Sequence, residues 1–171
     1  MDWFDPSPHI KNSKIITDIF GYWPTFHDAW IHKLNLSVVD GKPWEPDSAS
    51  PVLDMQVHVF EMTKDVTEEG YIVLAKHTLV CLQFRNIESL QLSNFSYQNS
   101  IFELIFGIEP KLFLYGGGPA EGPPPNVVTV KINSSCGLSG EFKCQTAEVL
   151  SAEPCDEFGN LPISPRSSSE T

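Results

Sequence analysis

Hydrophobic and polar residues alternate along most of this 171-residue chain. A period of two places every second side chain on the same face of an extended strand, so each alternating run predicts a strand with one buried face. The runs are Trp30–Val38, Val52–Glu61, Tyr71–Phe84, Ile87–Leu92, Ile101–Ile108, Val127–Ile132 and Gly140–Leu150. The longest, Tyr71–Phe84, is either one central strand or two strands divided near Lys76 and His77. Most connections are short, which is typical of antiparallel hairpins.

One segment near the N-terminus follows a helical period instead. The pairs Ile15–Ile19 and Ile16–Phe20 are each four residues apart, which places them on one face of a helix over residues 14–20. Gly21 follows as a natural C-cap. The pattern as a whole predicts a mostly β (α+β) fold, a curved antiparallel sheet or sandwich of about seven or eight strands with one N-terminal helix packed on it.

The composition of the ends and connections predicts the domain organisation. Residues 1–13 are expected to form a mobile N-terminal arm, residues 14–150 a single globular domain, and residues 151–171 a polar, disordered tail. The stretches 42–51 and 115–126 are rich in proline, glycine or small polar residues and predict loops, and Lys64–Gly70 predicts a charged connector.

Charge narrows the range of partners. The formal net charge is −11, which repels nucleic-acid backbone and anionic membranes and would attract a basic protein, although acidity can also serve solubility alone. No run approaches the roughly 20 apolar residues of a membrane span, and the N-terminus does not resemble a secretory signal, so a cytoplasmic location is expected. The four cysteines lack zinc-site spacing and are expected to be free, with Cys81 buried as a small hydrophobic residue, and no cofactor is expected.

The densest group of unusual residues joins the predicted helix to the first predicted strand. In Phe20–Ala29, His27 could act as a base oriented by Asp28, which would suit a small hydrolase. The alternative is structural, with Trp23 and Phe26 filling the core and Thr25 capping a turn. Adjacent residues on an extended chain point to opposite faces, which argues against direct cooperation of His27 with Asp28.

Histidines on neighbouring strands are weak candidates for a metal site. His58 and His77 could meet His27 or His32 across a sheet, and three imidazoles on one face could bind a metal ion. The sequence does not give the register, and a single strand histidine is usually a half-buried structural residue. A metal-dependent hydrolase using His27 and Asp28 is therefore kept as an alternative function.

The stretch Phe20–Ala29 resembles the immunity protein 50 family of bacterial polymorphic toxin systems. Three later stretches, Val59–Thr63, Tyr71–His77 and Leu92–Asn99, are also similar to that family, and the resemblance spans roughly Ile15 to Phe106. It implies a small, mostly β, cytoplasmic protein that has no catalysis of its own and neutralises a cognate toxin by binding it. The chain departs from the family pattern at Trp30, where an acidic residue would be expected, and this leaves the role of that position open.

The candidates for a partner contact follow from this resemblance and from the exposed aromatic residues. They are Trp23, Phe26, His27, Asp28, Trp30 and Trp44. The partner would be a basic toxin protein, since enzymes that grip phosphates are often basic, and binding would be sensitive to salt. A housekeeping protein-interaction module of the same fold is the remaining alternative, and the sequence does not determine the oligomeric state.

Overall fold

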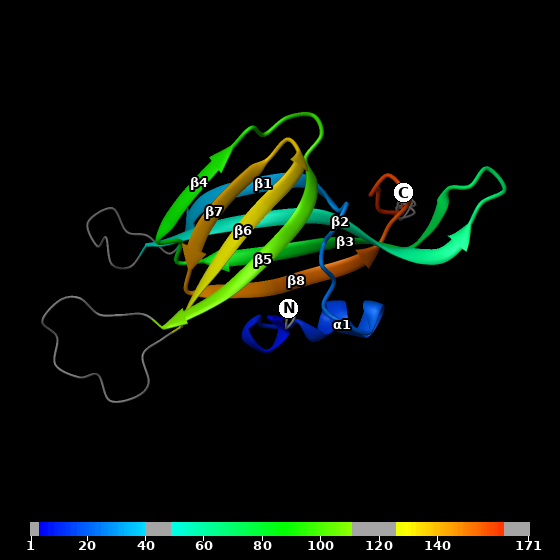
Figure 1. The fold of residues 1–171 in the computed structure, drawn as a ribbon. Coiled ribbons are helices and arrows are strands. Elements are labelled where there is room, and N and C mark those ends of the chain that lie inside the picture. Colours follow the sequence, from blue (N-terminus) through cyan, green and yellow to red (C-terminus); the bar gives the residue numbers. More distant parts are fainter. Residues whose placement is uncertain (1–3, 40–48, 111–125, 163–171) are drawn as a thin grey trace, which may run out of the picture.

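Eight antiparallel strands, one α-helix and one 3-10 helix make up the part of the chain that the computed structural model describes, residues 4–39, 49–110 and 126–162 (Figure 1). In chain order the elements are η1 (Ser7–His9), α1 (Lys14–Phe20), β1 (Trp30–Val39), β2 (Ser50–Val66), β3 (Ile72–Arg85), β4 (Ser89–Ser93), β5 (Ser100–Pro110), β6 (Asn126–Cys136), β7 (Ser139–Cys144) and β8 (Thr146–Pro154).

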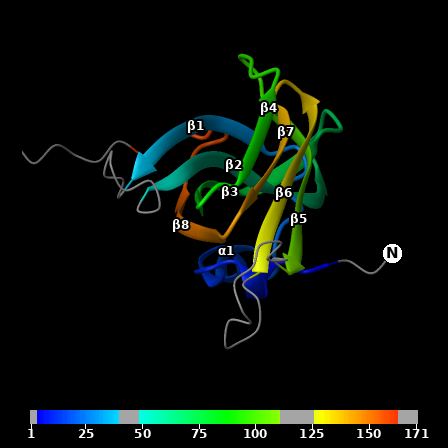
Figure 2. The same cartoon turned by 90° about the vertical axis from the view of Figure 1, so that its left-hand side faces the viewer.

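The strands form one open sheet in the order β4-β7-β6-β5-β1-β2-β3-β8. Within the described residues, β1 and β5 pair at a single position, Trp30 opposite Ser100. Two backbone hydrogen bonds flank this position, from Ile31 N to the Asn99 carbonyl at 2.9 Å and from Ile101 N to the Ala29 carbonyl at 2.8 Å. This seam divides the sheet into two four-stranded halves, which curve around a common interior with α1 below them (Figure 2).

The core lies between the two halves and α1. Phe84 of β3 and Phe142 of β7 meet across the interior at a centroid distance of 4.8 Å in an edge-to-face arrangement. Ile16 and Phe20 are the buried residues of α1, because their spacing of four places both on the face toward the sheet. The remaining core residues are aliphatic or aromatic side chains at alternate positions of the strands, including Leu53, Met55, Val57, Val80, Leu82, Val130, Ile132 and Val149.

The predicted fold class is confirmed. The predicted helix is also confirmed in its bounds and in its cap, where Gly21 has a φ of 84° and donates its N–H to the Thr17 carbonyl. The run Tyr71–Phe84 corresponds to one strand, β3. It is interrupted by a β-bulge at the predicted point of division, where Lys76 has a φ of 53° beside a register shift.

Two predictions about the strands are wrong. The run Gly140–Leu150 is two strands, because the chain leaves β7 at Gln145 and begins β8 in the other half of the sheet, beside β3. Hydrophobic periodicity does not reveal this crossing, because hydrophobic and polar residues alternate in both strands. The charged segment Lys64–Gly70 is not only a connector, because β2 continues to Val66 and pairs there with Ile72.

The extended ends of β2 and β3 form a two-stranded ribbon, here called the β2–β3 arm and comprising residues 61–76. β1 begins opposite His58 and β8 ends opposite Thr78, so beyond these positions β2 and β3 pair only with each other in the described part of the chain. The arm projects from the body at the right of Figure 1. Its base is fixed by an ion pair between Lys76 Nζ and Glu61 Oε2 at 3.0 Å.

The described terminal segments both pack against the first half of the sheet. Near the N-terminus, Ile10 is buried and Lys11 exchanges backbone hydrogen bonds with Ala147 and Val149 of β8. After β8, residues 155–160 fold back over the outer face, beginning with a hydrogen bond from Cys155 N to the His77 carbonyl at 3.0 Å. None of the helices in the described ranges has the length and apolar character needed to cross a membrane.

Candidate functional site

The junction between α1 and β1 is built around two buried aromatic residues. The Trp23 ring lies 5.7 Å from that of Phe26 and also 5.7 Å from that of Phe106 on β5, so the junction is anchored to the core. Thr25 Oγ1 accepts a hydrogen bond from His27 N at 3.2 Å, as the structural interpretation predicts. Trp23 and Phe26 therefore serve the core, and in this conformation they offer no surface to a partner.

His27 and Asp28 do contact each other, which corrects the expectation that they point to opposite faces. His27 Nδ1 lies 3.0 Å from Asp28 Oδ2. The expectation assumed an extended chain, but Phe26 and Asp28 have φ angles of 60° and 61°, which is left-handed rather than extended backbone. The two positive angles turn both side chains to the same side of the chain.

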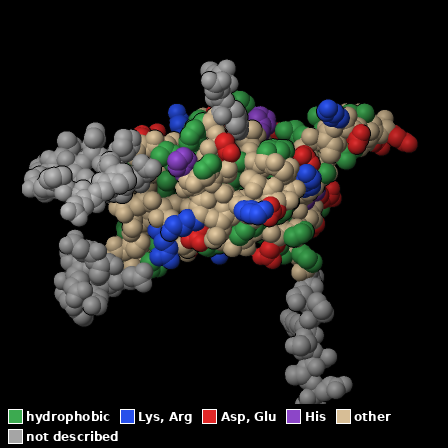
Figure 3. All heavy atoms as spheres, turned by 90° about the horizontal axis from the view of Figure 1, so that it is seen from below, with side chains coloured by type: hydrophobic (Ala, Val, Ile, Leu, Met, Phe, Trp, Pro, Cys, Tyr) green, Lys and Arg blue, Asp and Glu red, His purple; other side chains and the backbone are tan. Residues whose placement is uncertain are grey.

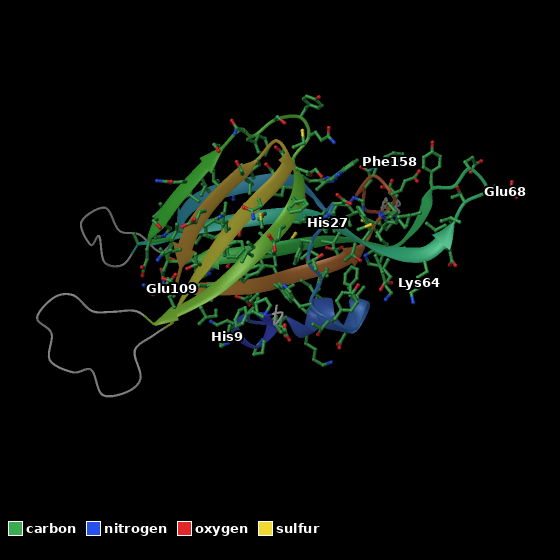
Figure 4. All side chains as sticks on the ribbon, viewed as in Figure 1. His9, His27, Lys64, Glu68, Glu109 and Phe158 are labelled. Carbon is green, nitrogen blue, oxygen red and sulfur yellow. The ribbon has the colours of Figure 1, made fainter. Side chains whose placement is uncertain are left out.

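The His27–Asp28 pair lies at the surface, and the His27 ring (labelled in Figure 4) also packs on the Phe102 ring of β5 at 5.2 Å. Both side chains are close to half exposed, so water screens the pair and limits its contribution to roughly 0.2–1 kcal/mol. A carboxylate that orients an imidazole is part of many catalytic sites, but such a site also needs a nucleophile or metal within reach. Among the described residues, His27 contacts Asp28, Phe102 and Thr25, and no third His, Cys, Asp or Glu side chain completes a metal-binding group with His27 and Asp28.

A second group of histidines lies on the outer face of the first half-sheet. His58 of β2 and His77 of β3 share a hydrogen bond of 3.0 Å between Nε2 and Nδ1, and the His32 ring of β1 lies edge-on to His58 at 5.8 Å. The predicted meeting of His58 with His77 is therefore found, with His32 beside them. His27 is not part of this group.

The C-terminal segment covers these rings. Asp156 holds a tight turn by accepting hydrogen bonds from Phe158 N at 2.9 Å and Asn160 N at 2.7 Å. Gly159 lies so close to His32 that a Cβ added to it would be 2.5 Å from His32 Cε1. The sequence predicts this segment as part of the C-terminal tail, and no motif in it signals the contact.

Burial gives His58 unusual electrostatics. Its side chain is 1% exposed, and Nδ1 has no hydrogen-bond partner among the described residues. Desolvation, followed by the fields of His77 and His32, lowers the pKa of His58 from 6.5 to about 4, although Asp156 acts in the opposite direction. His58 is therefore neutral at pH 7.

The histidine group does not have the arrangement of a metal centre. Within residues 4–39, 49–110 and 126–162, no three His, Cys, Asp or Glu side chains are placed to bind one metal ion. The weak candidates His27, His58 and His77 accordingly do not form a common site, because the chain directs His27 to Phe102 and Asp28 instead.

The cysteines are free, as expected, but the prediction for Cys81 is wrong. Cys81 is half-buried on the outer face of β3, where Gln56 Nε2 donates to its Sγ at 3.6 Å, because the alternate residues Val80 and Leu82 face the core. Cys144 is the buried cysteine, and desolvation raises the pKa of its thiol to about 12, which makes it unreactive.

The two remaining aromatic candidates differ in what can be said of them. Trp30 is 40% exposed and stands edge-on to His58 at 6.4 Å on the outer face, so part of its ring is free to contact a partner. Trp44 lies outside the described residues.

The β2–β3 arm is a surface that the sequence analysis did not identify. Large hydrophobic side chains are exposed along its full length, and carboxylates lie near its turn. Its signal was present in the sequence, since Tyr71–Leu74 contains three apolar residues in a row beside an acidic segment. Alternation alone could not show that the neighbouring strands stop before this ribbon does.

Comparison with known families assigns the chain to a class. It belongs to a family of immunity proteins. That family is immunity protein 50, whose model matches residues 12–155 and so extends from the segment before α1 to the end of β8. The resemblance noted in the sequence is confirmed, and the match continues well past Phe106, where the recognisable stretches ended. A search of curated proteins and a search of solved structures each gave no match.

Proposed function

We propose that this protein is an immunity protein that binds a cognate toxin and neutralises it without catalysis of its own. The observation that carries the proposal is the family match over residues 12–155, which includes both halves of the sheet, the helix and the arm. The family's description implies a toxin partner, and a protein of this class needs a binding surface rather than an active site.

The charge of the chain supports a basic partner. A net charge of −11 creates a field that draws a basic protein toward it and orients it before contact, which raises the association rate at low salt. Toxins that act on nucleic acids or other polyanions carry such basic surfaces. We place the complex in the cytoplasm, and the four free cysteines are consistent with a reducing compartment.

The exposed residues at the seam are contact candidates within this proposal. Trp30 offers a partly free indole, and His27 with Asp28 offers a polar pair beside the exposed Phe102 ring. Aromatic side chains rimmed by polar groups are typical anchors of protein interfaces.

A binding titration tests the proposal. The purified chain would be titrated, at low and at high salt, with the toxin domain that the proposal expects a neighbouring gene to encode, carrying an inactivating substitution. The expected result is a one-to-one complex with a dissociation constant of about 1 µM or tighter and weaker binding at high salt. Absence of binding at both salt concentrations would refute the proposal.

A further inference from the structure

One face of the β2–β3 arm is apolar and exposed to solvent. Met62 pairs with Leu74 and Val66 pairs with Ile72, and directly opposed residues of an antiparallel ribbon lie on the same face. Ile72 and Leu74 are two residues apart on β3, so all four side chains share that face. The exposed fraction is 44% for Met62, 40% for Leu74, 65% for Val66 and 54% for Ile72.

These residues do little for the fold. None of them belongs to the core, and no residue from 62 to 74 is buried. Both edges of the arm are also unpaired among the described residues, because β1 begins opposite His58 and β8 ends opposite Thr78, short of the arm. Four large apolar side chains on one face of a ribbon are unfavourable in water, and this free-energy cost is removed only when another surface covers that face.

Acidic groups lie around the turn of the arm. Asp65, Glu68 and Glu69 are exposed near the turn Thr67–Gly70, and none of the three forms an ion pair with another described residue. Figure 3 shows hydrophobic and acidic side chains, with a basic one, on the projecting arm, and Figure 4 places Glu68 at its tip and Lys64 further back. Among the described residues, the tip is therefore a negative end without ion-pair partners, beside an apolar face.

The base of the arm is fixed to the body. Lys76 pairs with Glu61 at 3.0 Å and lies 6.0 Å from the Phe20 ring at the end of α1, and the Tyr22 hydroxyl lies 3.5 Å from Glu61. These contacts lie on one side of the ribbon and fix the orientation of the arm relative to the body. A preorganised arm loses less conformational entropy on binding than a mobile loop would.

We propose that the β2–β3 arm inserts into a basic, apolar-walled cleft of the toxin, with Met62, Val66, Ile72 and Leu74 against the wall and the acidic tip among the basic groups. The inference deepens the proposed function and rests on it. Charge selects this occupant, because a second copy of the chain would bring another net charge of −11 to an acidic tip. A toxin cleft that binds a polyanionic substrate is basic, and its positive charge complements the acidic tip of the arm.

Two double variants separate the contributions of the apolar face and the acidic tip. The toxin domain encoded beside the gene, inactivated by substitution, is the probe, and binding rates are measured by surface plasmon resonance at low and high salt. V66S/I72S is expected to weaken binding by about 100-fold, through faster dissociation. E68K/E69K is expected to slow association by about 10-fold at low salt, with the difference shrinking at high salt.

Matched substitutions away from the arm serve as controls. Tyr97→Ser removes a fully exposed aromatic ring from the β4–β5 connection, and Glu141→Lys reverses an exposed charge on β7. Both are expected to bind within about 2-fold of wild type, since surface changes outside an interface have small effects. Thermal unfolding of every variant checks that the fold is retained.

The outcomes distinguish the inference from the function on which it rests. If the wild-type chain binds and both arm variants bind equally well, the inference is wrong and the proposed function stands. If the wild-type chain does not bind, both are wrong. A wild-type dimer in light scattering that V66S/I72S converts to a monomer would assign the face to self-association and overturn the inference.

Discussion

At the scale of single residues, His58 is the side chain most strongly shaped by its surroundings. It lies almost fully buried between His32, His77 and Trp30, and only its Nε2 has a hydrogen-bond partner among the described residues. The sequence indicated only that histidines of neighbouring strands could meet across a sheet. The burial that lowers the pKa of His58 depends on the turn held by Asp156, which covers the outer face from a distant part of the chain.

The lowered pKa predicts a loss of stability in mild acid. The pKa of His58 is 6.5 when unfolded and about 4 when folded, so between these values the unfolded chain binds a proton that the folded chain does not. Stability is therefore fully present above pH 6.5 and falls as the pH drops toward 4, by up to about 3 kcal/mol. Urea unfolding at several pH values measures it. His58→Gln should flatten this slope, and an unchanged slope would contradict the assignment.

Gly159 provides a test of the contact between the C-terminal turn and His32. Gly159 and Gly70 both have φ near 80°, but a Cβ on Gly159 would overlap the His32 ring, whereas one on Gly70 would meet nothing within 4 Å. Both alanine variants carry backbone strain of about 1 kcal/mol, and only Gly159→Ala adds the clash. We expect it to be the more destabilising in urea unfolding and to shift the His32 ring resonances. Equal effects of the two variants would contradict the contact.

The contact between His27 and Asp28 shows why the relative direction of two side chains could not be predicted from the sequence. The residues themselves were singled out correctly as unusual. Their relative direction depends on positive φ angles at Phe26 and Asp28, and the hydrogen bond from Asp28 N to the Ile101 carbonyl joins this turn to β5. The local sequence pattern gives no sign of this hydrogen bond to Ile101, which lies far along the chain.

At the scale of elements, the helix and most strands followed from periodicity because each has one buried face. α1 was predictable to the residue, since apolar spacing and the Gly21 cap agree. The division of Gly140–Leu150 at Gln145 was not, because both resulting strands keep the same period. Within the arm, the segment Lys64–Gly70 was predicted as a charged connector because its charges conceal the pairing of Val66 with Ile72.

Shortening the arm tests whether it serves the fold. Replacing Thr63–Val73 by Asn-Gly would join the opposed residues Met62 and Leu74 through a two-residue hairpin turn. Because the removed residues bury no core side chain, we expect the melting temperature to stay within about 3 °C of wild type. Ile16→Ala, which removes a fully buried side chain of α1, should instead cost about 2–4 kcal/mol. Loss of cooperative unfolding on shortening would show that the arm is structural.

At the scale of the whole molecule, two four-stranded halves joined at one seam enclose the core and leave the arm as a separate projection (Figures 1 and 2). The acidic composition acts at this scale, since a net charge of −11 shapes the long-range field more than any single pair does. The sequence indicated both the fold class and the family. It could not place the proposed binding surface, which depends on where β1 begins and β8 ends along β2 and β3.

Survival of bacterial cells that express the toxin tests whether this chain neutralises it. Cells would carry the active toxin domain encoded beside the gene, together with the wild-type chain, the shortened-arm variant or an empty vector. We expect growth with the wild-type chain, arrest with the empty vector and loss of protection when the arm is shortened. Arrest in the presence of the correctly folded wild-type chain would contradict the claim.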